Sequence, residues 1–492
     1  MLLRASSGQQ RPATRQERVT TPSPSETAPK LRRHTPEINP LPDMLRANLF
    51  PLLLLAGLVL GFSSCDDDES PNNPVLGTIL DALSADPEYS TFVSALETTG
   101  LDASLDIASN RFTVFAPTNA AFSAAGASLD NLSDDELRQV LRYHILQGPI
   151  LREGEVPDGV SSQATLNRNP ADQAVPLTLD SDGTTIRLDD MASTTTGPTE
   201  VVNGVYYGID AVLMPPTVLD RAGMAGNFTT LLSALERAGL DSLLASAGNY
   251  TIFAPTDAAF TASGIDLATV SDADLAQLLR YHVVTPALPA ASIPAGQSFQ
   301  TTLSTAGPDG APLSLLLENA GAVTVNGSAT VTTPNQYGTN GVVHVIDEVL
   351  EMQSVADFLV EATVLDSLAG LITAAELADD LDGNGPFTVF APVNAGFTDA
   401  ADTLATLSMA QVRDVLLYHV AGDNLRSDEL TDELSIPTLT AGQALTVALD
   451  ENDDPVLMTA DSTLVPFTAT DIQAINGVIH LVGSVLLPDL ED

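Results

Sequence analysis

One short segment occurs three times in this chain, and the spacing of its copies constrains the fold more than any other feature. Each copy is eleven residues long, begins with an aromatic residue and has Phe-Ala-Pro near its centre. The copies occupy residues 112–122, 250–260 and 387–397. Their central phenylalanines, Phe115, Phe253 and Phe390, are 138 and 137 residues apart. A period of that length is a whole domain, so the 492 residues are predicted to contain three like domains in tandem.

Two further landmarks recur with the same period. A Tyr-His pair follows each central phenylalanine, and its histidine is always 29 residues later. The pairs are Tyr143 and His144, Tyr281 and His282, and Tyr418 and His419. An Asn-Gly-Val sequence stands near the end of each repeat and begins at Asn203, Asn340 and Asn476. Asn-Gly is a signal for a two-residue hairpin turn, because both residues tolerate positive backbone angles.

The early part of each repeat has a helical pattern. In the second repeat, apolar residues at three- and four-residue spacing between residues 228 and 240 predict a helix with one buried face. The strand predicted at residues 251–254 ends at Pro255, because proline cannot extend a central ladder. Thr256 or Asp257 is placed to cap the short helix that follows.

A second helix in each repeat has a marked start, and strands follow it. Ser133 and Ser408 begin capping boxes, and Ser271 begins a near variant that ends in aspartate. Residues 342–350 are almost continuously apolar, which suits a strand covered on both faces. Helices early and strands late predict an α+β fold, in which helices pack against an antiparallel sheet.

The domain boundaries follow from the repeat and from two short joints. Pro215-Pro216 separates the first two domains, and Met352-Gln353 separates the second from the third. Joints this short leave little room for free tumbling of the domains. The predicted domains are residues 76–215, 216–352 and 353–489.

The segment before the first domain is predicted to direct export. Residues 1–43 are basic and have no apolar periodicity, so we expect them to be disordered, or absent if translation starts at Met44 instead of Met1. Residues 44–64 have a positive start, a short apolar centre and small final residues, the layout of a secretory signal.

A lone cysteine, Cys65, directly follows those small residues, and the segment therefore resembles a bacterial lipoprotein signal. Phe62 departs from the leucine usual at its position. The resemblance implies cleavage before Cys65 and lipid attachment there, with residues 65–75 as an acidic tether. The alternative is an ordinary cleaved signal with an incidental cysteine.

The charge of the chain excludes several classes of function. From Cys65 onward there are 60 acidic residues and 11 arginines, and no lysine. Such an acidic surface repels nucleic acid phosphates and anionic lipids. It indicates either simple solubility or adaptation to high salt, where screening removes the self-repulsion. One cysteine allows no internal disulfide, and the lack of lysine excludes a phosphate-binding loop of the Walker type.

The three recurring landmarks resemble those of the fasciclin domain family, over about residues 75–489. The resemblance implies wedge-shaped α+β domains and roles in extracellular adhesion or matrix association, usually without catalysis. In some animal members the Tyr-His region is linked to integrin binding, a partner that should not be transferred to a protein with a bacterial lipoprotein signal. The first repeat has Tyr207 where the others have His344 and His480, so we expect the first domain to differ there.

The Tyr-His pairs have two interpretations. Each histidine follows apolar residues at helical spacing, which is typical of a hydrogen-bonded core residue. The alternative is a ligand contact. The candidate contact residues are Tyr143, His144, Tyr281, His282, Tyr418 and His419.

The sequence gives little support to catalysis or a metal site. It has no Gly-x-Ser-x-Gly elbow and no His-x-x-x-His spacing. Residues 380–385 copy the first half of an EF-hand loop, but Ala391 stands where the bidentate glutamate should be. A turn role is therefore favoured for residues 380–385 and for the acidic loop at residues 450–454. Weak attraction for divalent cations remains a hypothesis.

Together these features predict a cell-surface protein for adhesion or matrix association, without catalytic activity and without a cofactor. It would be anchored by lipid at Cys65 to the cell envelope, at the outer membrane surface, and bind surface proteins or matrix polymers. The alternative function is glycan binding, which the absence of tryptophan and the small number of tyrosines disfavour. A hydrolase is less favoured still.

Overall fold

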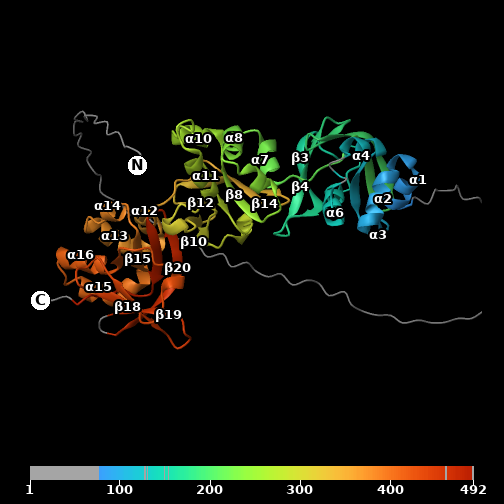
Figure 1. Cartoon of the computed structure of the whole chain (residues 1–492). Coiled ribbons are helices and arrows are strands. Elements are labelled where there is room, and N and C mark those ends of the chain that lie inside the picture. The colour runs from blue at the N-terminus through green and yellow to red at the C-terminus, as the bar shows by residue number, and fades with distance from the viewer. Residues whose placement is uncertain are drawn as a thin grey trace, which may run out of the picture. The chain divides into compact units, whose positions relative to one another are not determined.

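The computed structural model describes residues 77–489, apart from residues 127, 128, 130, 149, 153, 460 and 461. The predicted signal segment, Cys65 and the acidic tether lie outside the described residues. The described residues form three consecutive α+β domains, here called domains 1, 2 and 3 (Figure 1). The predicted fold class and the threefold repetition are confirmed.

Domain 1 has most of its helices before most of its strands. Its helices are α1 (Ile79–Ala85), η1 (Pro87–Tyr89), α2 (Ser90–Thr99), α3 (Asp102–Leu105), α4 (Asn119–Ala125) and α6 (Asp134–Tyr143). Its strands are β1 (Phe112–Pro117), β2 (Ile145–Gln147), β3 (Gly159–Arg168), β4 (Ala174–Ser181), β5 (Ile186–Leu188), β6 (Ala192–Val201) and β7 (Gly204–Ile209).

Domain 2 repeats this order. Its helices are α7 (Val218–Ala225), α8 (Thr229–Arg237), α9 (Asp241–Ala245), α10 (Asp257–Ser263), α11 (Asp272–Tyr281), η2 (Ala290–Ser292) and η3 (Pro308–Gly310). Its strands are β8 (Tyr250–Pro255), β9 (Val283–Val284), β10 (Gly296–Thr301), β11 (Ser314–Asn319), β12 (Val323–Val325), β13 (Ala329–Gly338) and β14 (Gly341–Ile346).

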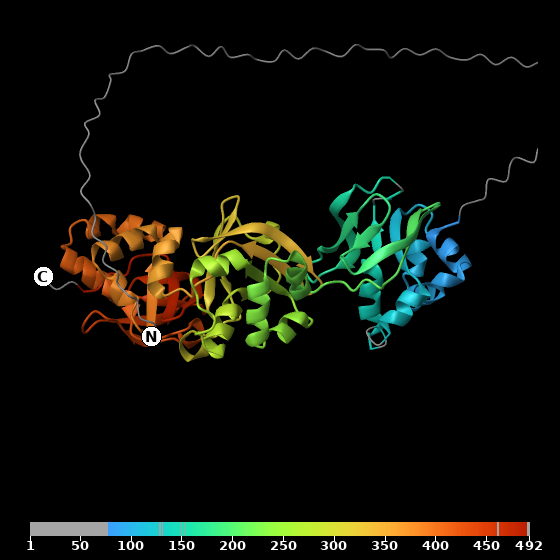
Figure 2. The same ribbon diagram turned by 90° about the horizontal axis from the view of Figure 1, so that it is seen from above.

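Domain 3 follows the same plan. Its helices are α12 (Val355–Glu361), η4 (Thr363–Leu365), α13 (Asp366–Ala374), α14 (Ala378–Leu381), η5 (Asn394–Gly396), α15 (Phe397–Leu404), α16 (Met409–Tyr418) and η6 (Ser427–Glu429). Its strands are β15 (Phe387–Pro392), β16 (Val420–Ala421), β17 (Ser435–Pro437), β18 (Ala444–Leu449), β19 (Pro455–Met458), β20 (Leu464–Ala474) and β21 (Gly477–Val482). Within each domain the helices lie to one side of the strands (Figure 2).

The sheet of each domain is mixed, and this differs from the antiparallel sheet that the sequence predicts. The first strand of the domain pairs in parallel with the last, β1 with β7, β8 with β14 and β15 with β21. The other pairs of strands are antiparallel. Two strands can be parallel only across a long connection, and here the rest of the domain supplies it.

The sheets differ in how far they close. In domain 1 the seven strands form a closed barrel, through pairing of Leu146 in β2 with Thr165 in β3. In domains 2 and 3 the two ends of the seven-stranded sheet meet only through isolated bridges, Val284 with Thr302 and Ala421 with Thr438.

The parallel pair explains why glycine follows asparagine in each Asn-Gly-Val sequence. A Cβ on Gly341 would lie 2.0 Å from the carbonyl oxygen of Tyr250 at the start of β8. Gly204 and Gly477 stand equally close to Phe112 and Phe387. Only glycine allows the two strands to approach this closely.

Each domain has two large apolar clusters, one between the helices and the sheet and one inside the curled sheet, and domains 1 and 3 each have a third, smaller one. The central phenylalanines of the repeated segment, Phe115, Phe253 and Phe390, are fully buried in the second kind of cluster. Alternate residues of the first strand therefore supply both clusters, as expected for a strand covered on both faces.

The helix starts agree with the capping signals, but one predicted helix is divided. The boxes at Ser133 and Ser408 form as predicted, and Ser271 caps α11. The stripe between residues 228 and 240 is buried, but it belongs to α8 and to the turn before α9. The helix ends at Arg237 because Gly239 adopts a positive φ of 66°.

The repeated segment itself places two caps. Thr256 accepts from the amide of Ala259 at 3.2 Å and so begins α10. The carboxylate of Asp257 instead accepts from the amide of Thr230 at 2.7 Å, in the first turn of α8. The sequence left open which of the two residues is the cap, and the structure assigns Thr256 to α10 and Asp257 to α8.

Candidate functional site

Each histidine of the Tyr-His pairs connects its helix to the chain segment that leaves the domain. In domain 2, the Nε2 atom of His282 accepts from the amide of Leu350 at 2.9 Å, so the proton of the neutral ring lies on Nδ1. Nδ1 donates to the carbonyl of Leu278 at 2.8 Å. The same bonds are made by His144 with Leu213 and Val140, and by His419 with Leu486 and Val415. Burial lowers the pKa of all three histidines to about 4.

The tyrosines of these pairs are also buried and hydrogen-bonded. The hydroxyl of Tyr281 donates to the carbonyl of Ser314 at 2.9 Å and accepts from Nδ2 of Asn326 at 2.9 Å. The hydroxyl of Tyr418 donates to the carbonyl of Ala444, and the hydroxyl of Tyr143 lies 2.9 Å from the carbonyl of Pro176. Burial raises the pKa of Tyr143 and Tyr281, so both stay neutral.

The structure therefore places all six candidate contact residues in the domain interiors. This is the arrangement of the core interpretation, in which both ring nitrogens have partners. Contact of a ligand through these residues stays a prediction, and the hydroxyl of Tyr143 already accepts from Arg221 of domain 2. The residues are Tyr143, His144, Tyr281, His282, Tyr418 and His419.

In domains 2 and 3 a histidine of the last strand donates a hydrogen bond to a backbone carbonyl. In domain 1 a tyrosine donates to the equivalent carbonyl. Nε2 of His344 donates to the carbonyl of Leu288 at 2.8 Å, and the ring stacks on Phe253 at 5.6 Å. His480 repeats both contacts with Leu425 and Phe390. In domain 1 the hydroxyl of Tyr207 donates to the carbonyl of Leu151 at 2.6 Å, and its ring stacks on Phe115. The expectation that domain 1 must differ in this role was wrong, because a longer side chain reaches the same acceptor.

The asparagine of each Asn-Gly-Val sequence binds two separate segments of its domain, and we call it the clamp asparagine. From the sequence it was expected only to form a turn. In domain 2, Oδ1 of Asn340 accepts from the amide of Val218 at 2.9 Å, at the start of α7. Its Nδ2 donates to the carbonyls of Leu244 and Ser246 at 2.8 and 2.7 Å. Asn203 and Asn476 do the same for α1 and α12. The only signal for this role in the sequence is the regular spacing.

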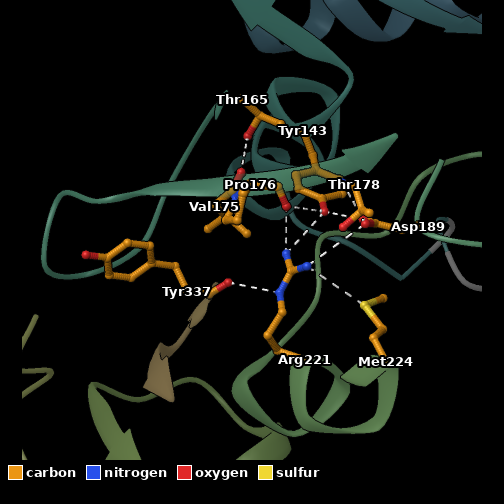
Figure 3. A network of polar contacts seen from close by, with 9 residues as sticks. All are labelled: Tyr143, Thr165, Val175, Pro176, Thr178, Asp189, Arg221, Met224 and Tyr337. Carbon is orange, nitrogen blue, oxygen red and sulfur yellow. Dashed lines mark hydrogen bonds and ion pairs between the residues drawn. The ribbon is translucent and has the colours of Figure 1, made fainter. Parts of the chain in front are cut away.

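A buried arginine of domain 2 contacts several residues of domain 1 (Figure 3). Arg221 projects from α7, and its Nη2 donates to the carbonyl of Pro176 at 2.7 Å and to the hydroxyl of Tyr143 at 3.4 Å. Nη1 lies 3.9 Å from the carboxylate of Asp189, whose side chain is fully buried. Asp189 also accepts from the amide of Thr178 and the hydroxyl of Tyr143. No pattern in the sequence identified Arg221, although this residue interrupts the apolar face of α7.

The junction of domains 2 and 3 is apolar at the equivalent position. Phe358 occupies in α12 the place that Arg221 has in α7, and its ring contacts Phe299 of domain 2 edge-on at 5.8 Å. Leu316 of domain 2 belongs to the helix-side core cluster of domain 3. A hydrogen bond from the amide of Gln473 to Oγ of Ser314 also crosses this junction, at 3.0 Å.

The EF-hand-like segment of the sequence has structural contacts. Oδ2 of Asp380 accepts from Arg413 at 2.8 Å, and Asn476 binds the carbonyls of Leu381 and Gly383. In the other acidic loop, Oδ1 of Asp450 accepts from two backbone amides of its own turn. Within the described residues, no group of three or more His, Cys, Asp or Glu side chains is placed to hold a metal ion.

Two cavities of about 500 Å³ each lie where domains meet, and these are the candidate binding sites. One lies between domains 1 and 2 and is lined largely by apolar groups, with Val140, Pro170 and Met214 among them. The other lies between domains 2 and 3 and is lined by acidic side chains; we call it the acidic cavity. Cavities at domain junctions are common places for ligands. In the part of the chain that the structure describes, every helix is too short or too polar to cross a membrane.

Comparisons with known proteins agree on one family. The model of the fasciclin domain matches residues 87–215, 226–352 and 364–488. The chain is 29% identical over 353 residues to transforming growth factor-beta-induced protein ig-h3 of Sus scrofa, covering 69% of this chain and 49% of that protein. It is 26% identical over 423 residues to periostin of Homo sapiens, covering 84% of this chain and 48% of that protein. The chain thus spans about half the length of these curated relatives.

A bacterial relative and a solved structure were also found. An uncharacterized protein of Synechocystis is 33% identical over 139 residues, which is 28% of this chain and 98% of that protein. A solved FAS1 domain pair from the insect cell adhesion molecule fasciclin I aligns with a TM-score of 0.37 and 20% identity. It covers 54% of this chain and 98% of that structure.

Proposed function

The chain belongs to the fasciclin domain family, and from that membership we propose that it is a non-catalytic adhesion or matrix-association protein at the cell surface. Its partners would be surface proteins or matrix polymers that contact the outer faces of the three domains. The insect relative is described as a cell adhesion molecule, which supports this class of function.

One observation supports the proposal: the residues that recur in all three repeats stabilise the interior of each domain. The tyrosines and histidines of the pairs, the clamp asparagines and the central phenylalanines are all buried and contact their own domain. An active site would instead present reactive side chains in a cleft. Contacts with partners therefore fall to the variable outer surface, as expected for a scaffold that displays binding faces.

The mode of attachment to the envelope is part of the proposal. We propose that Cys65 carries a lipid after cleavage of residues 44–64, with residues 65–75 as a tether and domains at residues 76–215, 216–352 and 353–489. The layout of the signal and the lone cysteine support this. The outer membrane surface is the proposed location. Adaptation to high salt stays a prediction, which thermal unfolding measured against NaCl would decide.

Deletion of the gene in its host tests the function. We expect fewer cell–cell and cell–surface attachments in the deletion strain, and recovery when the full chain is restored. A chain with Cys65→Ser should be made but should leave the membrane fraction for the medium, and it should not restore attachment. Normal attachment after deletion, with a new defect in metabolite turnover, would contradict the proposal. Loss of binding to one neutral glycan only would favour the glycan-binding alternative.

A further inference from the structure

The acidic cavity between domains 2 and 3 has an unusual lining. Its walls come from α10, the turn after β12, the segment that leaves domain 2, and α12. The acidic residues that line it are Glu348, Glu351, Asp357 and Glu361. Among the described residues, no arginine, lysine or histidine lines it. Asp357 caps α12 by accepting from the amide of Ser354, so its carboxylate already has donors.

Two buried acceptor atoms among the lining residues have no donor among the described residues. Gln353 is only 9% exposed, and its Nε2 donates to the carbonyl of Glu351 at 3.0 Å, but its Oε1 has no partner. Oε2 of Glu361 is also buried without a partner. An acceptor that is buried without a donor is unfavourable. A ligand group that carries only N–H donors is the kind of partner that such acceptors lack.

The position of Glu361 gives an electrostatic reason for a cation to bind in the acidic cavity. It is the last residue of α12, where the free carbonyls of the helix end disfavour a negative charge and favour a cation. Burial, and then the nearby carboxylate of Asp357, raise the pKa of Glu361 to about 7. The ionised carboxylate therefore stands in surroundings that a positive group would improve.

At the junction of domains 1 and 2 an arginine pairs with some of the buried acceptors, although Oε1 of Gln139 and Oδ1 of Asn167, which line the cavity there, have no partner among the described residues. The clamp asparagines bind the first amides of α7 and α12, so the two helices can be aligned residue by residue. This alignment places Phe358 at the position of Arg221, and Asn326 stands where domain 1 has Asp189. At the first junction the chain supplies its own guanidinium to buried acceptors. At the second it supplies acids and acceptors but no cation among the lining residues.

We propose that the acidic cavity binds an organic cation, an alkylammonium or a guanidinium group, with Glu361 and Gln353 as its acceptors. Glu348 and Glu351 add negative charge at the rim. A volume of about 500 Å³ suits a ligand of this size rather than a bare metal ion. The cation is either a free amine or a basic side chain of a partner protein. This site does not depend on the adhesive role and can be tested apart from it.

Calorimetry on the purified full chain tests the site. At pH 8, where Glu361 is ionised, the chain is titrated with putrescine, with the N-acetylated peptide Gly-Gly-Arg-Gly-Gly and with its N-acetylated glutamine counterpart, which carries no cation. We expect one saturable site for a cationic probe and none for the glutamine peptide. Tenfold tighter binding of the arginine peptide would identify a partner's side chain as the natural ligand, and tighter binding of putrescine would identify a free amine.

Variants separate this site from general attraction to an acidic surface. Glu361→Gln should weaken binding at least tenfold, and Gln353→Ala should weaken it at least threefold. Glu236→Gln is the matched control, because Glu236 is exposed on α8 and the change in charge is the same. Melting followed by circular dichroism shows that each variant folds. Absence of saturable heat, or equal weakening by Glu236→Gln, would overturn the proposal.

Discussion

At the residue scale, the buried histidines make the folded state sensitive to acid. His144, His282 and His419 are neutral in the structure, with Nε2 as an acceptor, so a second proton would break the bond to a backbone amide. Their pKa is lowered from 6.5 to about 4. The unfolded chain therefore binds more protons between these values, and stability falls as the pH decreases from about 6.5 towards 4.

This gives a prediction for the effect of pH on stability. Each of the three histidines should cost on the order of 2 kcal/mol at pH 5 relative to pH 8. Glu361 acts in the opposite direction, because its raised pKa makes it less unfavourable as the pH falls. Thermal unfolding of the full chain should show the loss. In the variant His282→Gln, whose amide has one donor and one acceptor and does not titrate, the loss should be smaller by about 2 kcal/mol. His344 and His480, whose pKa is also lowered by burial, add to the total loss in both proteins. An unchanged pH dependence in that variant would contradict the assignment.

Individual residues also show which roles could be predicted from the sequence and which could not. The burial of the Tyr-His pairs was one of two interpretations, since helical spacing places them on the apolar face. The role of Tyr207 could not be predicted. Its equivalence to His344 depends on a shared acceptor, the carbonyl of Leu151 or Leu288, and no pattern in the sequence identifies a backbone partner that is distant along the chain.

At the scale of elements, one residue distinguishes the third copy of the repeated segment. Thr118 and Thr256 cap α4 and α10 with their hydroxyls, but domain 3 has Val393 at this position. Without the hydroxyl, the chain forms the short 3-10 turn η5 before α15 begins at Phe397. The missing cap accounts for the later start of this helix.

Exchange of these residues tests that explanation. Thr256→Val should destabilise the chain by about 1 kcal/mol, because the amide of Ala259 loses its acceptor. Val393→Thr should stabilise it by less than about 0.5 kcal/mol, because the equivalent amide, that of Gly396, already donates to the carbonyl of Val393 at 2.8 Å. Urea unfolding measures both changes. Effects of equal size and opposite sign would show that the turn η5 does not replace the cap.

The parallel pairing of first and last strands is the element-scale feature that the sequence did not reveal. Apolar runs such as residues 342–350 indicated a strand covered on both faces, and that was correct for β14. The pattern carries no information on direction, however. The register of β8 with β14 depends on the close approach of the two strands at Gly341, whose lack of a Cβ was visible only as part of a turn signal.

At the scale of the whole molecule, the junction of domains 1 and 2 depends on a buried charge pair. The side chains of Arg221 and Asp189 are 8% and 0% exposed. Removal of one partner leaves the other charge buried and uncompensated. Because the two residues belong to different domains, neither the repeat nor the composition could indicate that they meet. The sequence predicted only that the joint at Pro215-Pro216 is short.

Arg221→Ala should therefore destabilise the chain by about 3 kcal/mol or more. Addition of Asp189→Asn to that variant should recover part of the loss, since domain 2 itself has Asn326 at this position. The control is Arg152→Ala, which removes exposed ion pairs and should cost less than about 1 kcal/mol. Urea unfolding of the three variants is the measurement. Equal effects of Arg221→Ala and Arg152→Ala would show that the buried pair contributes little.

The clamp asparagine and the histidine of the Tyr-His pair determine how a domain responds to a force that pulls on the two ends of the chain. In domain 2 the incoming chain is bound at Val218 and the outgoing chain at Leu350, and both anchors lead to the parallel pair β8 and β14. Tension along the polypeptide would load the bonds of that pair lengthwise and together, rather than open them one after another. A domain built in this way resists extension, as the proposed role of an anchored adhesion protein would require.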